Sequence, residues 1–134
     1  MIGILVVTHE QLCEHLIRCA CHVLGERPAQ LQSLGVFVEN DPDDVLINMR
    51  TLIQKLDTGE GVLILCDILG ATPCNIASRL IQRDHVACIT GINLPMLVRA
   101  LTYRHETLAA TVNKALDGGK NGVVEISAGN GHAA

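Results

Sequence analysis

Short apolar stretches alternate with amphipathic helical patterns along almost the whole chain. The stretches with the length and composition of buried strands lie at residues 2–7, 31–37, 62–66 and 86–90. The helical patterns cover about residues 10–24, 42–56, 72–82, 94–104 and 106–116. Because parallel strands must be joined by crossover segments that cover the sheet, this alternation predicts an α/β fold of three layers, α/β/α, with a mainly parallel sheet.

The expected strand order is 2-1-3-4, a common order for such chains, in which the first and third strands are neighbours. Residues 118–122 contain three glycines and predict a turn. Residues 123–126 alternate in hydrophobicity and predict a short last strand that suits a sheet edge. We therefore expect a single domain over residues 1–127 and a disordered tail over residues 128–134.

Helix starts are marked by side chains that can cap them. Thr8 with Gln11 fits a capping box that would open a helix near Glu10. Asp41 before Pro42 fits a cap followed by proline at the first helical position.

Composition excludes several classes of function. The chain has 134 residues, of which 49% are hydrophobic, but it contains one Phe, one Tyr and no Trp, so the core must be aliphatic. The net charge of −4, without a cluster of Lys or Arg, argues against nucleic acid or an anionic membrane as partner. No apolar run reaches the ~20 residues of a membrane span, and no signal peptide precedes the first strand, so we expect a soluble, cytoplasmic protein without direct membrane insertion.

Two polar residues follow buried strands and form the candidate catalytic pair. His9 lies just past the first strand and Asp67 directly follows the third. If these strands are neighbours, the carboxylate can accept a hydrogen bond from one ring nitrogen of His9 and leave the other as a nucleophile. The alternative is a structural His–Asp pair, because a buried carboxylate needs a partner in any case.

The loop after Asp67 is a candidate anion site. Gly70 and Ala71 provide small backbone positions, and Thr72 followed by Pro73 predicts a helix start. Free N–H groups at a helix start can hold a phosphate, and the hydroxyl of Thr72 can cap the helix or donate to a bound oxyanion. The alternative is an ordinary turn between strand and helix.

Metal and cofactor chemistry is not expected. His15, Cys19 and His22 follow one another at a spacing that puts them on one helix face, but no fourth ligand is evident, so we predict neither a metal site nor a cofactor. The six cysteines include no CxxC pair, and we expect free thiols.

Three blocks of sequence together resemble one known family. Thr8-His9 after the first strand, residues 67–75 (DILGATPCN) and residues 91–97 (GINLPML) are similar to the mannose-family IIA component of the bacterial phosphoenolpyruvate-dependent sugar phosphotransferase system. The likeness covers roughly residues 1–127. The family fold implies a mainly parallel sheet whose last strand, here residues 123–126, is antiparallel and in some relatives is exchanged between the two chains of a homodimer.

The resemblance implies a phosphocarrier and its partners. His9 would accept a phosphoryl group from the phosphohistidine of the general carrier HPr and pass it to a IIB component for sugar uptake. Asp67 would orient the ring of His9, and Thr72 with the backbone of Gly70 and Ala71 would contact the phosphoryl oxygens. Transfer between histidines needs no metal.

The chain departs from the family pattern next to the histidine. Glu10 stands where relatives commonly carry Gly, and Ala71 stands where Gly is also common. The alternatives are a stand-alone regulatory module whose phosphorylation state controls partner binding, since the sequence shows no IIB domain or linker, and the phosphocarrier of the dihydroxyacetone kinase system. Residues 67–73 and 91–95 fit the sugar-transport branch better.

Overall fold

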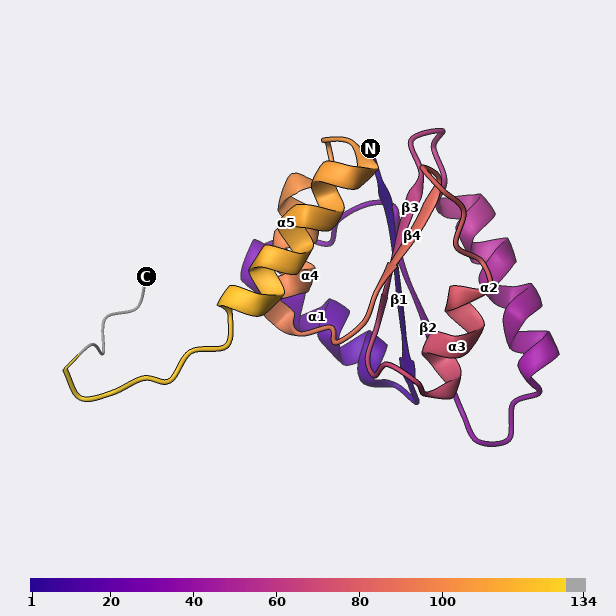
Figure 1. Cartoon of the computed structure of the whole chain (residues 1–134), viewed down its shortest axis with the longest axis horizontal. Helices are drawn as coiled ribbons and strands as arrows, with labels where there is room; N and C mark the ends of the chain where they lie inside the picture. Colours follow the sequence, from indigo (N-terminus) through magenta and orange to yellow (C-terminus); the bar gives the residue numbers. More distant parts are fainter. Residues whose placement is uncertain (130–134) are drawn as a thin grey trace.

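A central sheet lies between two layers of helices, as the alternation of strands and helices predicts. The computed structural model describes residues 1–129. Figure 1 shows the sheet edge-on, with α1, α4 and α5 on one side and α2 and α3 on the other. No helix within residues 1–129 is long and apolar enough to cross a membrane.

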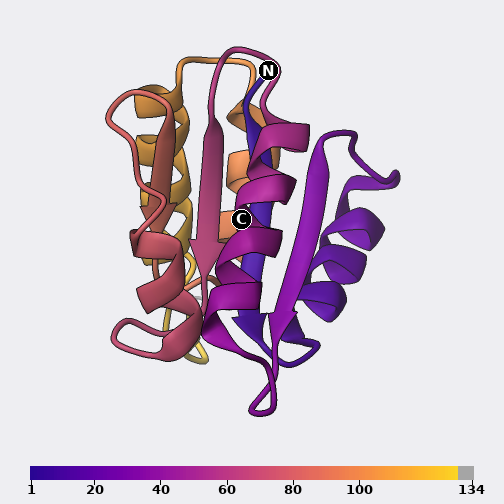
Figure 2. The same ribbon diagram turned by 90° about the vertical axis from the view of Figure 1, so that its right-hand side faces the viewer.

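The sheet has the predicted order and direction. It consists of β1 (Gly3–His9), β2 (Leu31–Val36), β3 (Val62–Cys66) and β4 (Val86–Ile89). The order is β2-β1-β3-β4, and all three neighbouring pairs are parallel. Figure 2 shows β2 and β3 ending at the same edge of the sheet. Because all strands share one direction, the residues that follow β1 and β3 meet at that edge.

One apolar core lies on each face of the sheet, between the strands and the helices that cover them. The helices are α1 (Leu12–Leu24), α2 (Pro42–Leu56), α3 (Thr72–Ser78), α4 (Leu94–Tyr103) and α5 (Leu108–Asn121). Alternate residues of β1 point to opposite cores: Ile4 and Val6 pack with α1, α4 and α5, whereas Leu5 and Val7 pack with α2 and α3. All four side chains are fully buried, as expected for a strand covered on both faces.

One predicted helix start is confirmed and one is wrong. Asp41 caps α2, since its side chain accepts from the backbone N–H of Asp43, and Pro42 is the first helical residue. The capping box at Thr8 is not formed. Strand β1 continues to His9, α1 begins only at Leu12, and Gln11 makes no side-chain cap.

The turn predicted at residues 118–122 is also wrong, because α5 continues to Asn121. Here the glycines serve helix packing. A Cβ on Gly118 would lie 2.6 Å from Cβ of Arg99, and one on Gly119 would lie 2.7 Å from Cε of Met96. Glycine therefore lets α5 approach α4 more closely than any other residue could, which outweighs its low helix propensity.

The last strand predicted at residues 123–126 is not formed in the single chain. This segment has no strand pairing, and Figure 1 shows it leaving the end of α5 away from the sheet. Val123 and Ile126 are 78% and 79% exposed. A strand needs a hydrogen-bonding neighbour, and no sheet edge of the same chain lies along this path. The tail predicted to be disordered (residues 128–134) falls largely on residues 130–134, outside the described residues.

Candidate functional site

His9 and Asp67 meet at the carboxyl edge of the sheet, as their positions after neighbouring strands predict. Nδ1 of His9 lies 2.8 Å from Oδ2 of Asp67, and the backbone N–H of His9 donates to the same oxygen at 2.8 Å. The side chain of Asp67 is 8% exposed, whereas that of His9 is 50% exposed. The carboxylate is thus enclosed, and the ring that it holds projects into solvent.

The protonation of this pair follows from the bonds to Asp67. Burial alone would raise the pKa of Asp67, but hydrogen bonds from the backbone N–H of His9, from its ring and from the N–H of Ile68 outweigh that effect and lower the pKa below its ordinary value. An ionised carboxylate can only accept, so Nδ1 of His9 must carry the proton. In the tautomer that carries its proton on Nδ1, Nε2 has a free lone pair.

The segment of residues 91–97 holds the backbone of Asp67 in place. The backbone N–H of Gly91 donates to the carbonyl oxygen of Asp67 at 3.1 Å, and that of Ile92 donates to the carbonyl of Cys66 at 3.0 Å. Asn93 caps α4 by accepting from Met96 and also donates to the carbonyl of Gly119 in α5. Residues 91–93 therefore position the site without contacting the ring of His9 in any recorded bond.

Thr8 holds the turn after His9. Its side chain is fully buried, and its hydroxyl accepts from the backbone N–H of Cys13 at 2.8 Å and donates to the carbonyl of His9 at 3.1 Å. The hydroxyl thus ties the end of β1 to the start of α1. The predicted capping box would have paired the hydroxyl of Thr8 with the backbone N–H of Gln11. In the structure the hydroxyl accepts from the N–H of Cys13 instead.

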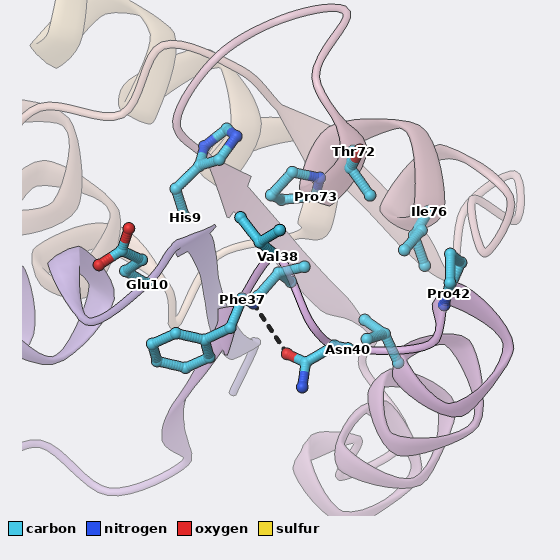
Figure 3. A pocket seen from close by; sticks show the side chains of 11 residues that line it. His9, Glu10, Phe37, Val38, Asn40, Pro42, Thr72, Pro73 and Ile76 are labelled. Carbon is cyan, nitrogen blue, oxygen red and sulfur yellow. Dashed lines mark hydrogen bonds between the residues drawn. The ribbon is translucent and has the colours of Figure 1, made fainter.

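A cavity of about 420 Å³ opens beside His9. Figure 3 shows His9 and Glu10 on one side of it, and Thr72, Pro73 and Ile76 on the other. The lining contains no lysine or arginine. Of the three residues predicted to bind an anion, one lies at this cavity. Thr72 lines this cavity, whereas Gly70 and Ala71 are not among the lining residues.

Helix α3 (Thr72–Ser78) begins where the predicted helix of residues 72–82 begins but ends earlier, and Thr72 is not its cap. Ala71 occupies the cap position, and Thr72 is the first helical residue. Its hydroxyl forms no hydrogen bond with any residue in the described range 1–129, and it is exposed. The backbone of Gly70 has a φ of 84°, a conformation that favours glycine, and it turns the chain between Asp67 and the helix. The hydroxyl of Thr72 is therefore available to a bound group.

One wall of the cavity was not anticipated from the sequence. It is formed by the loop after β2, in which the backbone N–H of Phe37 donates to Oδ1 of Asn40 at 2.8 Å (Figure 3). Val38 at the tip of this loop is 99% exposed. One signal in the sequence could have indicated this wall. The apolar residues Phe37 and Val38 follow the end of β2, although a loop that only faces solvent is usually polar.

The candidate metal ligands do not assemble. Within residues 1–129, no group of three or more His, Cys, Asp and Glu side chains is placed to hold a metal ion. The six cysteines are free thiols, as expected.

Comparisons with known proteins show which family the chain resembles in sequence. A family model described as "EIIA-man: PTS system fructose IIA component" matches residues 3–116. The chain is 35% identical over 133 residues to the "PTS system mannose-specific EIIAB component" of Escherichia coli (strain K12), a match that covers 95% of this chain and 40% of the relative. The chain thus spans only about two fifths of that relative's length. It is also 26% identical over 111 residues to the "PTS system sorbose-specific EIIA component" of Klebsiella pneumoniae, covering 82% and 79% of the two chains.

Solved structures match over nearly the whole chain. The phosphotransferase system component EIIA from Streptococcus agalactiae superposes with a TM-score of 0.83 at 23% identity, covering 93% of this chain and 97% of that one. The mannose/sorbose specific IIA subunit from Enterococcus faecalis superposes with a TM-score of 0.84 at 17% identity, covering 94% and 95%. At these identities the two structures establish the likeness of the fold.

Proposed function

The chain belongs to the mannose-type IIA family of the sugar phosphotransferase system, and on that premise we propose that it is a phosphocarrier that uses His9. In this proposal His9 accepts a phosphoryl group from the phosphohistidine of HPr and passes it to a IIB component for sugar uptake. The observation that carries the proposal is the 2.8 Å bond between Nδ1 of His9 and the buried carboxylate of Asp67, which leaves Nε2 free beside a cavity.

The transfer step uses the lone pair of Nε2. As the bond from Nε2 of His9 to phosphorus forms, the bond between phosphorus and the donor's ring nitrogen breaks, and its electron pair stays on the donor's ring. Positive charge then develops on the His9 ring, whose Nδ1–H points at the ionised Asp67. Because phosphoryl transfer depends mainly on positioning and charge stabilisation, this fixed ion pair is the main contribution of the protein.

We assign Gly70, Ala71 and Thr72 to the phosphoryl group. The first residues of a helix have N–H groups without intrahelical partners, and Thr72 is the first residue of α3. Its exposed hydroxyl lines the cavity that His9 also lines. Ala71 and Gly70 precede it in the loop that begins at Asp67, so their backbone groups are the nearest further donors along the chain.

We propose further that the protein acts in the cytoplasm as a homodimer. The cytoplasm is where phosphoenolpyruvate-dependent carriers would meet it. The support for a dimer is the segment of residues 123–126, whose apolar side chains Val123, Val124 and Ile126 are exposed in the single chain. Strand β4 is at an end of the described sheet, and an edge strand presents unpaired backbone groups to which such a segment could bind.

The test is phosphorylation in a defined mixture. The protein is incubated with phosphoenolpyruvate, enzyme I and HPr, and its intact mass is measured beside that of His9→Ala. We expect one acid-labile phosphoryl adduct on the unaltered protein and none on the variant. His15→Ala, which removes an exposed histidine on α1, is the matched control and should still form the adduct.

Two results would contradict the proposal. The first is the absence of any adduct while HPr itself is phosphorylated, and the second is an adduct that persists in a folded His9→Ala variant. An adduct that forms on His9 but is not discharged by any IIB component would instead favour the regulatory module.

A further inference from the structure

The residue after His9 is held in an unfavourable backbone conformation. Glu10 has a φ of 49°. Within residues 1–129, the other residues with a positive φ are glycines, Gln30 and Asp84. A Cβ makes this left-handed region unfavourable. A side chain kept at such a position suggests a role for that side chain.

Contacts with β2 fix this conformation. The backbone N–H of Glu10 donates to the carbonyl of Val36 at 3.0 Å. Gly35 passes so close beneath that a Cβ on it would lie 2.1 Å from the carbonyl oxygen of Glu10. The turn cannot therefore relax away from the sheet, and the direction in which the side chain of Glu10 leaves the backbone is set.

The carboxylate of Glu10 is exposed and has no counter-ion among residues 1–129. Within the described part of the chain, its oxygens take part in no recorded hydrogen bond or ion pair. It lines the same cavity as His9, and Figure 3 shows the two side chains on adjacent positions at its rim. They are the only ionisable side chains among the eleven lining residues, so no lysine or arginine of that lining offsets the negative charge.

Further carboxylates surround this edge of the sheet. They include Glu14 in the first turn of α1, Glu39 in the loop that lines the cavity, Asp41 at the cap of α2, and Asp43 and Asp44 in the first turn of α2. A phosphoryl group on Nε2 of His9 brings close to two further negative charges into this field. Among these carboxylates, Glu10 is directly bonded to His9 in the chain and should have the largest effect.

We propose that Glu10 sets the phosphoryl-transfer balance of His9: its unpaired carboxylate raises the free energy of the phosphorylated state, so that His9 passes the group on more readily than it retains it. Asp67 makes the ring a competent acceptor, and Glu10 limits how firmly the ring keeps what it has accepted. This inference rests on the proposed function, since it concerns the same histidine and the same transfer.

The test is the equilibrium between HPr and this protein. Phosphorylated HPr is mixed with the protein at several ratios, and both phosphorylated fractions are measured by intact mass at low and at high salt. We expect Glu10→Gln to raise the equilibrium constant for phosphorylation of His9 about fivefold at low salt, with a smaller increase at high salt because salt screens exposed charges. Glu10→Asp keeps the charge and should stay close to the unaltered protein.

Two variants separate charge from structure. Glu10→Gly removes the carboxylate and the unfavourable φ together, and it should match Glu10→Gln. Glu14→Gln removes an exposed carboxylate in the first turn of α1, further along the chain from His9, and should change the equilibrium much less.

The possible outcomes separate a failure of the role of Glu10 from a failure of the phosphocarrier function. If all variants are phosphorylated on His9 and Glu10→Gln has the equilibrium constant of the unaltered protein, the role of Glu10 is refuted and the phosphocarrier stands. A salt-independent increase, or an equal increase in Glu10→Asp, refutes it as well, because neither is electrostatic. If no form accepts a phosphoryl group while HPr is phosphorylated, the proposed function fails and the inference fails with it.

Discussion

The His9–Asp67 pair and the segment of residues 123–126 differ in how many contacts they make within the chain. The carboxylate of Asp67 accepts three hydrogen bonds, two from His9 and one from Ile68, and its side chain is 8% exposed. Within the described residues 1–129, the segment of residues 123–126 has no strand partner, and its apolar side chains are exposed. One region is complete inside the single chain and the other is not.

The difference separates what one chain can do alone from what needs a second molecule. The hydrogen bond that orients the ring of His9 comes from Asp67 of the same chain, so the orientation of the ring does not depend on another copy. Within residues 1–129, no surface covers Val123, Val124 and Ile126, and in the proposed homodimer a second copy would bury them. Mutations in the first region should therefore change transfer rates, and mutations in the second should change association.

The largest effect is expected from Asp67→Asn. The amide keeps the shape but cannot stabilise the positive charge that develops on the His9 ring, and it no longer fixes the proton on Nδ1. We expect the rate of phosphoryl transfer from HPr to fall about a hundredfold, since groups that stabilise charge in a transition state have effects of this size. The rate is measured by rapid quenching and intact mass. Asp117→Asn removes an exposed carboxylate on α5 and should leave the transfer rate unchanged. A similar loss of rate in Asp117→Asn, or no loss in Asp67→Asn, would contradict the special role of Asp67.

A smaller effect, on association alone, is expected from Val124→Ser combined with Ile126→Ser. If the segment pairs with a second copy, each substitution removes apolar burial, and together they should weaken a dimer at least ~tenfold. The measurement is the mass in solution as a function of concentration. The matched control is Val23→Ser with Ile47→Ser, two apolar side chains on α1 and α2 that are each 57% exposed. A monomer at all concentrations for the unaltered protein would contradict the dimer, and the transfer rate should not change in either double variant.

The smallest effect is expected on acid stability. Hydrogen bonds hold the pKa of Asp67 below its ordinary value in the folded protein. Its contribution to stability is therefore fully present above the unfolded-state pKa, ~3.9, and is lost as the pH falls through the lower folded-state pKa. The free energies of unfolding of the protein and of Asp67→Asn should thus differ less at about pH 3 than at about pH 6 in urea titrations. A difference that grows toward acid pH would mean that the pKa of Asp67 is raised.

Local patterns were sufficient for the parts of the fold and the site that depend on neighbours in sequence. Strand β1, the cap at Asp41 and the parallel order follow from hydrophobic period, helix caps and the rules of crossover connections. His9 and Asp67 could be paired in advance because parallel strands end at a common edge. Thr72 could be placed near them because a helix that follows β3 must begin at that edge.

The remaining features depend on contacts between segments that are distant in sequence. Gly118 and Gly119 look like a turn until α4 is placed against α5, because only the close contact shows why a side chain is excluded. The wall formed by Phe37 and Val38 appears only when the loop after β2 lies opposite Thr72.

The sequence by itself determined the order of strands and helices, the His9–Asp67 pair and the place of the loop that leads from Asp67 to Thr72, since these follow from backbone periodicity and chain direction. The tertiary structure alone decided the left-handed turn at Glu10, the cavity beside it and the lack of a partner for residues 123–126. The physical reason is that steric exclusion and hydrogen-bond pairing are properties of two surfaces in contact, and a sequence pattern describes only one of them.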